Sequence, residues 1–163
     1  MKFSLVDKVL EVSDDRIVAV KAVSTAEEYL QDHFPSFPVL PGVFMLESLT
    51  QAARELLVRR LGPLARRHVL AEVRALKYGT FVSPGDTMRL DVTLTELNDD
   101  GSATFKASAT VLRAERIGGE GGVGEEAPTC ASGRLLLRPA RPLGPTRRRI
   151  GPNAGGARAH DPA

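Results

Sequence analysis

Hydrophobic and polar residues alternate along much of the chain with a period of two, the spacing of side chains on a half-buried β-strand. Residues 16–22 (RIVAVKA) show this alternation, and residues 5–12 form a shorter apolar-rich run. Asp14-Asp15 between them predicts a turn. Alternation or short apolar runs predict four further strands, at residues 68–78, 87–97, 103–115 and 130–138.

One segment has helical spacing instead, with apolar residues at Leu46, Leu49, Ala53, Leu56 and Leu57. We predict a helix that opens at Pro41-Gly42, because proline is favoured in the first turn, and that runs to about Arg60. Upstream, Thr25 is expected to cap a short helical turn, with Glu28 three residues later. The prolines of residues 33–41 exclude regular helix there and predict a rigid loop.

One long helix among six strands predicts the α+β class, with an antiparallel sheet packed around the helix. A chain of 163 residues fits one domain, which we assign to residues 1–139. Residues 116–128 are rich in Gly and Glu and are expected to form a mobile loop. Residues 140–163 are rich in Arg, Pro and Gly and are expected to be a disordered tail.

Composition excludes several classes of protein. The net positive charge of the chain lies in the tail, which has five arginines and one aspartate. Residues 1–139 hold 17 basic and 19 acidic residues and do not suggest nucleic-acid binding. No apolar stretch is long enough to span a bilayer, and charges at Asp7, Lys8 and Glu11 argue against a signal peptide, so a cytoplasmic protein is expected. The single cysteine, Cys130, suggests neither a disulfide nor a zinc site and is expected to be buried in a strand.

His33 and Glu47 are the candidate catalytic residues. His33 lies in the proline-rich loop and can accept a proton at neutral pH, whereas His68 and His160 are expected to be incidental. Glu47 lies one turn into the helix among apolar residues, where a carboxyl group can stay protonated and donate its proton. Each also has a structural interpretation, since most lone histidines are structural and a carboxylate near a helix start favours the helix dipole.

A third component is the start of the predicted helix. The first amides of a helix have no intrahelical acceptor, and the helix dipole favours negative charge beside them. Gly42 leaves this backbone open, so its N–H can bind a thioester carbonyl and the charge that develops on it. A base, an acid and an oxyanion donor are the groups that elimination of water requires.

The segment HFPSFPVLPGVFMLESLTQAA resembles the active-site segment of the FabZ-type 3-hydroxyacyl-[acyl-carrier-protein] dehydratases of bacterial fatty acid synthesis. The family pattern is close to His-Phe-Pro-Gly-x-Pro-x-x-Pro-Gly-Val followed by a glutamate and a glutamine. The matching positions are His33, Phe34, Pro35, Pro38, Pro41, Gly42, Val43, Glu47 and Gln51. Lys77-Tyr78 and Pro84-Gly85-Asp86 are similar to a second, less specific family segment.

This resemblance implies a hotdog fold, a long helix wrapped by an antiparallel sheet. It implies a homodimer in which His33 of one chain faces Glu47 of the other, and it is compatible with three such dimers forming a hexamer. It implies that His33 removes the α-proton, that Glu47 expels the 3-hydroxyl as water, and that the Gly42 amide holds the thioester oxygen. Substrate contacts are implied for Phe34, Phe37, Pro41, Val43 and Gln51. Neither a metal nor an organic cofactor is expected, because the phosphopantetheine arm arrives with the carrier.

The chain also departs from the family pattern. Ser36 replaces a usual glycine, Phe37 replaces a smaller or polar residue, and Gly79-Thr80-Phe81 replaces a stretch that is often basic and contains proline. Because these changes are near the expected substrate entrance, they favour a divergent member of the family, with an acyl preference or pathway other than housekeeping fatty acid synthesis.

The expected macromolecular partner is an acyl carrier protein, which is typically acidic. Between positions 54 and 77 seven basic residues outnumber two acidic ones, and this stretch is either a carrier-binding patch or an ordinary solvated surface. The alternative functions are a hotdog acyl thioesterase and a noncatalytic acyl-binding hotdog subunit.

Overall fold

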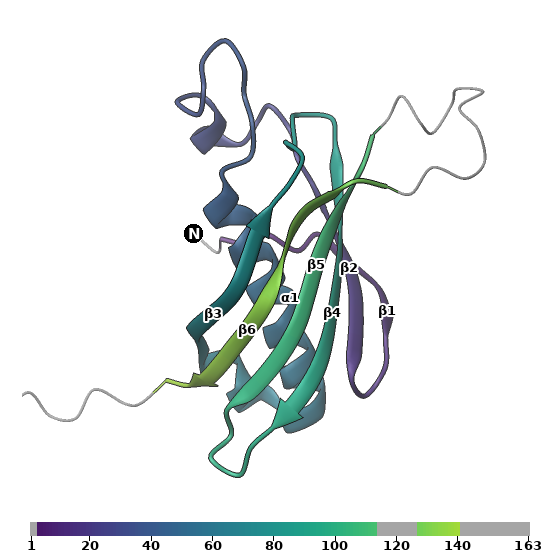
Figure 1. The fold of residues 1–163 in the computed structure, drawn as a ribbon, viewed down its shortest axis with the longest axis vertical. Helices are drawn as coiled ribbons and strands as arrows, with labels where there is room; N and C mark the ends of the chain where they lie inside the picture. Colours follow the sequence, from purple (N-terminus) through teal and green to yellow (C-terminus); the bar gives the residue numbers. More distant parts are fainter. Residues whose placement is uncertain (1–2, 114–126, 141–163) are drawn as a thin grey trace, which may run out of the picture.

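The computed structural model describes residues 3–113 and 127–140 (Figure 1). Their elements, in chain order, are β1 (Lys8–Val12), β2 (Arg16–Ala22), η1 (Glu28–Leu30), α1 (Gly42–Leu61), η2 (Pro63–Arg67), β3 (His68–Tyr78), β4 (Thr87–Leu97), β5 (Ala103–Leu112) and β6 (Thr129–Pro139). The six strands form one sheet in the order β1-β2-β4-β5-β6-β3, and every neighbouring pair is antiparallel. The α+β class predicted from the sequence is therefore confirmed.

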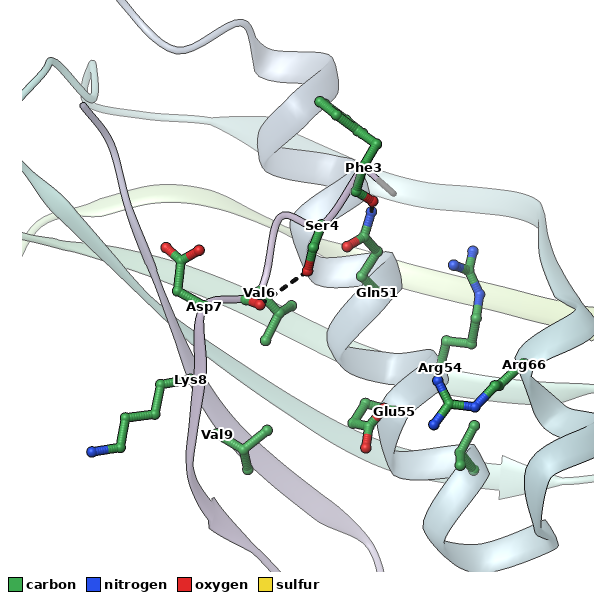
Figure 2. Close-up of a pocket in the computed structure, with 11 residues that line it drawn as sticks. Phe3, Ser4, Val6, Asp7, Lys8, Val9, Gln51, Arg54, Glu55 and Arg66 are labelled. Carbon is green, nitrogen blue, oxygen red and sulfur yellow. Dashed lines mark hydrogen bonds between the residues drawn. The ribbon is translucent and has the colours of Figure 1, made fainter. Parts of the chain in front are cut away.

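The segment before β1 crosses α1. Residues 3–7 and the first two residues of β1 lie along the side of α1 that carries Gln51, Arg54, Glu55 and Val58, and a groove of about 300 Å³ runs between them (Figure 2). Leu5 in this segment is buried. The helix is thus enclosed by the sheet on one side and crossed by the N-terminal segment on another.

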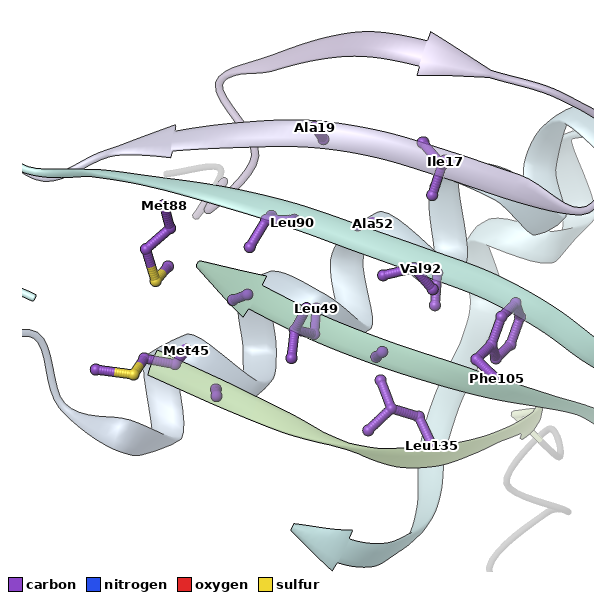
Figure 3. Close-up of a cluster of buried hydrophobic side chains, with 14 of the residues drawn as sticks. Ile17, Ala19, Met45, Leu49, Ala52, Met88, Leu90, Val92, Phe105 and Leu135 are labelled. Atoms are coloured by element: carbon purple, nitrogen blue, oxygen red, sulfur yellow. The ribbon is translucent and has the colours of Figure 1, made fainter. Parts of the chain in front are cut away.

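The core lies between α1 and the central strands (Figure 3). Alternate residues of β4 and β5 are buried, among them Met88, Leu90, Val92 and Phe105, because successive side chains of a strand point to opposite faces. The helix buries Leu49, Ala52, Ala53, Leu56 and Leu57 against them. The predicted helical stripe is therefore largely the core-facing side of α1.

β3 is an edge strand and is bound along one side only, by β6. Its register with β6 shifts twice, between Leu70 and Glu72 and between Arg74 and Lys77. Among the described strands, none pairs with its other edge. A free strand edge presents N–H and C=O groups that another chain can pair with.

The predicted elements agree with the structure except at some ends. The first strand begins at Lys8 rather than Leu5, and the fifth ends at Leu112, with positions 114 and 115 outside the described residues. The capping prediction for Thr25 is wrong, because the helical turn is the 3₁₀ helix Glu28–Leu30, with Glu27 at its N-cap and no side-chain cap. Most of the expected loop at 116–128 and nearly all of the expected tail at 140–163 lie outside the described residues.

Cys130 lies in a buried strand as predicted, and His68, expected to be incidental, makes structural hydrogen bonds. Cys130 is buried in β6, and its Sγ donates to the Ala109 carbonyl at 3.4 Å; burial raises the pKa of this thiol to about 11. His68 begins β3, and its ring nitrogens lie 3.1 and 2.9 Å from the carbonyl oxygens of Ala65 and Gly101. Within the described ranges, no helix combines the length and apolar character needed to cross a membrane.

Candidate active site

The proline-rich loop before α1 folds into a small hairpin. The amide of Val39 donates to the His33 carbonyl at 2.9 Å, while Phe34 and Phe37 exchange two backbone hydrogen bonds. Leu40 is buried, and its amide donates to the Val82 carbonyl at 2.8 Å, so the loop is tied to the segment between β3 and β4. These contacts give the rigid loop that the three prolines predict.

His33 is held in one orientation by its own loop. Its Nδ1 lies 2.9 Å from the Val39 carbonyl oxygen, and its ring stacks on Phe34 with a centroid separation of 4.5 Å. A carbonyl oxygen only accepts hydrogen bonds, so in this contact the hydrogen lies on Nδ1. The lone pair on Nε2 is then free to accept a proton, the state that a general base needs.

Glu47 lies in the second turn of α1 and is partly buried. Its Oε1 accepts a hydrogen bond of 3.0 Å from Nε2 of Gln51, one turn later. The oxygen of the Gln51 amide accepts from the backbone amide of Leu5 at 2.8 Å. The carboxyl group is therefore connected through Gln51 to the N-terminal segment, which lies far away in sequence.

The start of α1 offers two free backbone donors. Pro41 is the N-cap, and its carbonyl accepts from the amides of Phe44 and Met45. The amides of Gly42 and Val43 make no hydrogen bond within the residues that the structure describes. Both stand where the helix dipole favours a negatively charged oxygen. The geometry therefore supports an anion or carbonyl site at Gly42.

Tyr78, at the end of β3, covers the same position. A Cβ added to Gly42 would lie 2.9 Å from Cε1 and Cζ of the Tyr78 ring, so only glycine fits beneath it. Burial raises the pKa of Tyr78 above its ordinary value. The next residue, Gly79, runs so close to the Thr129 carbonyl that a side chain would clash with it, which accounts for glycine at this departure from the family pattern.

Several apolar side chains near these groups are exposed. Phe34, Phe37, Val43, Tyr78 and Phe81 are each about half exposed or more. Phe37 and Phe81 meet edge to face, with centroids 6.1 Å apart. Both residues depart from the family pattern, so the structure brings two departures that are 44 positions apart into contact.

The structure does not join His33 to Glu47 within one chain. Neither a hydrogen bond nor an ion pair links the two side chains among the described residues. Of the predicted substrate contacts, Phe34, Phe37 and Val43 are exposed, Pro41 is buried, and Gln51 is partly buried beside Glu47. No group of three or more His, Cys, Asp or Glu able to hold a metal occurs in the described part of the chain.

Residues 1–117 match the model of the FabA-like domain. The chain therefore belongs to this family of hotdog-fold dehydratases, and its relatives identify it as the FabZ type. The 3-hydroxyacyl-[acyl-carrier-protein] dehydratase FabZ of Clostridium perfringens is 40% identical over 110 residues, which are 67% of this chain and 78% of the relative. FabZ of Oenococcus oeni is 44% identical over 109 residues, 66% of this chain and 77% of the relative.

Solved structures share the fold at lower identity. The dehydratase heterocomplex ApeI:P from Xenorhabdus doucetiae aligns with a TM-score of 0.56 at 18% identity, covering 85% of this chain and 99% of the other. A hypothetical thioesterase with coenzyme A from Streptococcus pneumoniae aligns with a TM-score of 0.54 at 12% identity, covering 82% and 84%. The predicted hotdog fold is confirmed.

Gly42→Ala is expected to lower kcat/KM by about thirtyfold, roughly 2 kcal/mol, because the added methyl group pushes Tyr78 away and disturbs the free amides. Steady-state kinetics measure this loss. Adding Tyr78→Ala removes the obstructing ring, so the double variant should recover part of it. Equal losses in Gly42→Ala and in the double variant would show that the clash with Tyr78 is not the cause.

Proposed function

We propose that this chain converts 3-hydroxyacyl thioesters carried on acyl carrier protein into trans-2-enoyl thioesters, in the synthesis of fatty acids or related acyl chains. Membership of the FabZ type supports the reaction class, a hydro-lyase. The observation that carries the proposal to this chain's residues is the contact of His33 Nδ1 with the Val39 carbonyl, which leaves Nε2 free as a base.

In the proposed mechanism, Nε2 of His33 removes the proton from the carbon next to the thioester carbonyl. The electron pair of that C–H bond becomes the new double bond, and the bond from the third carbon to its hydroxyl oxygen breaks. Glu47 gives that oxygen a proton, so it leaves as water. The Gly42 amide binds the thioester oxygen while negative charge develops on it. No cofactor takes part.

The proposed catalytic unit is a homodimer. His33 and Glu47 make no contact within the described residues of one chain, and the outer edge of β3 is unpaired there. A second copy paired along β3 would bring His33 towards Glu47 of the partner subunit. Further assembly of three dimers into a hexamer is compatible with this arrangement, and the cytoplasm is the proposed location.

The basic residues proposed to attract the carrier separate into two groups. Arg59 and Arg60 lie in the last turn of α1, roughly 25 Å along the helix from Gly42. Arg66 and Arg67 lie in η2, which follows α1. Lys77 adjoins Tyr78, is exposed, and forms no ion pair with the described residues. Arg74 is already paired with Glu72 at 2.6 Å. We therefore assign the carrier contact within the same chain to Lys77.

Phe37 and Phe81 are the proposed determinants of acyl preference, with Phe34, Pro41, Val43 and Gln51 as further substrate contacts. Phe37→Ala is expected to raise kcat/KM for long acyl chains relative to short ones by about tenfold, because it opens the edge-to-face pair. Kinetics with short, medium and long 3-hydroxyacyl thioesters measure the ratio. Leu64→Ala, at an exposed apolar residue of η2, is the matched control and should leave the ratio unchanged. A uniform change across chain lengths would contradict this role.

The test of the function is an assay of the purified protein with a 3-hydroxyacyl thioester on carrier protein. Formation of the conjugated enoyl thioester, seen by ultraviolet absorbance and mass spectrometry, is the expected result. Release of a free thiol would identify a thioesterase instead. Binding without turnover would identify a noncatalytic acyl-binding subunit.

A further inference from the structure

Residues 3–5 are anchored to α1 rather than to a strand of the sheet. Leu5 is 1% exposed and lies in the interior, while the ring of Phe3 packs on Phe44 of α1 with a centroid distance of 5.5 Å. Phe3 also contacts Tyr29, whose hydroxyl donates to Glu27. Residues 3–5 are thus fixed to the first turns of α1 on the side of Gln51 (Figure 2).

Two backbone groups of this segment hold the side-chain amide of Gln51. The Leu5 amide donates to Gln51 Oε1 at 2.8 Å, and Gln51 Nε2 donates to the Phe3 carbonyl at 3.5 Å. The shorter bond requires the oxygen of Gln51 to face Leu5, and the longer one requires the nitrogen to face Phe3. Both contacts therefore select the same orientation of the amide.

That orientation of the Gln51 amide determines which of its atoms contacts the Glu47 carboxyl group. The nitrogen of Gln51 has a second hydrogen, which it donates to Glu47 Oε1 at 3.0 Å. If the amide were turned over, its nitrogen would face the Leu5 N–H, donor against donor, and its oxygen would face the Phe3 carbonyl, acceptor against acceptor. The backbone at residues 3–5 therefore keeps a donor directed at Oε1 of Glu47, which leaves Oε2 to carry the proton that catalysis uses.

We propose that residues 3–5 are a positioning element for the catalytic acid, acting through Gln51 on Glu47. The inference rests on the proposed function, because it assigns Glu47 as the acid. A carboxyl fixed at one oxygen retains fewer orientations, so less of its freedom must be lost when the substrate hydroxyl approaches. The element contributes no atom to the reaction and is remote in sequence from the His-Phe-Pro motif.

The test is a double-mutant cycle between Leu5→Pro, which removes the N–H donor, and Gln51→Leu, which removes the link. Each single variant should lower kcat by about tenfold, because the acid is misplaced. Leu5→Pro, which changes no proposed substrate contact, should also keep KM within about twofold. In the Gln51→Leu background, Leu5→Pro should have no further effect on kcat. Val6→Ala is the control for destabilisation of the same segment and should leave kcat unchanged at a temperature where all variants are folded.

Hydrogen exchange at the Leu5 amide tests the link without relying on activity. Protection should fall in Gln51→Leu but persist in Gln51→Glu, which keeps an acceptor for Leu5 and removes the donor to Glu47. Gln51→Glu should still lose kcat, and it provides this test even if Leu5→Pro does not fold. Additive losses of kcat in the cycle, or unchanged protection in Gln51→Leu, would overturn the proposal. An inactive wild type with a protected, Gln51-dependent Leu5 amide would instead disprove the proposed function alone.

Discussion

His33→Ala is expected to lower kcat by about a thousandfold while KM changes by less than about threefold, because general base catalysis of this kind contributes two to four orders of magnitude. Within the described part of the chain, the His33 side chain makes a single hydrogen bond, to the Val39 carbonyl, so its loss should cost only about 1 kcal/mol of stability. Stopped-flow or steady-state measurement of enoyl product gives kcat, and thermal unfolding gives the stability.

His68→Ala is the matched control for this prediction. His68 is buried and bonded on both ring nitrogens, so its loss should lower the unfolding temperature more than His33→Ala does. Its kcat, measured where the protein remains folded, should stay near that of the wild type. His33→Ala should thus lower kcat strongly and the unfolding temperature little, whereas His68→Ala should lower the unfolding temperature and leave kcat nearly unchanged. Similar kcat values for wild type and His33→Ala would remove His33 from the mechanism.

Glu47→Gln has the second large expected effect, a loss of about two to three orders of magnitude in kcat. The substitution keeps the size of the side chain and an oxygen that accepts from Gln51, but it removes the acidic proton. Glu55→Gln, two turns further along α1, is the control and should change kcat by less than about twofold. Enoyl product formation measures both. A Glu47→Gln variant as active as Glu55→Gln would exclude Glu47 as the acid.

The two inactive variants together test whether the site is shared between chains. In a heterodimer of one His33→Ala chain and one Glu47→Gln chain, a shared arrangement produces one site that lacks both groups and one site that is intact. Doubly tagged, purified heterodimers should therefore recover about half of the wild-type activity. If both groups come from the same chain, each site lacks one of them and the heterodimer stays inactive.

Much of the fold follows from local patterns. Strands predicted at 16–22, 68–78 and 87–97 coincide with β2, β3 and β4. In β4 the period-two alternation of the sequence reflects one buried face of the strand. The error at Thr25 has a local cause, since a side-chain cap competes with a turn that instead leads into the 3₁₀ helix at Glu28. Neither the order of strands in the sheet nor the placement of residues 3–7 on α1 has any such local signal.

Some parts of the candidate site can likewise be predicted from the sequence, and others cannot. His33, Gly42 and Glu47 are identifiable because the prolines and the helix start place them within a short stretch of sequence. The Val39 carbonyl, the Tyr78 ring and the Leu5 amide are not identifiable, since the first and last act through backbone atoms, whose chemistry is the same at every position. Tyr78 approaches Gly42 only through the tertiary fold. The spacing of Phe37 and Phe81 likewise gives no sign that their rings meet.

The alkylation rate of the single thiol, Cys130, can report local opening of the sheet near the end of β3. Its backbone carbonyl accepts from the Gly79 amide, so it adjoins the end of β3 that carries Tyr78. With a pKa raised to about 11 and no exposed surface, the native thiol should be inert to alkylating reagents at neutral pH. Alkylation would then require β6 to separate from its neighbouring strands, so its rate would measure how often this opening occurs. Acyl ligands that stabilise the closed state would slow alkylation and could be detected without turnover.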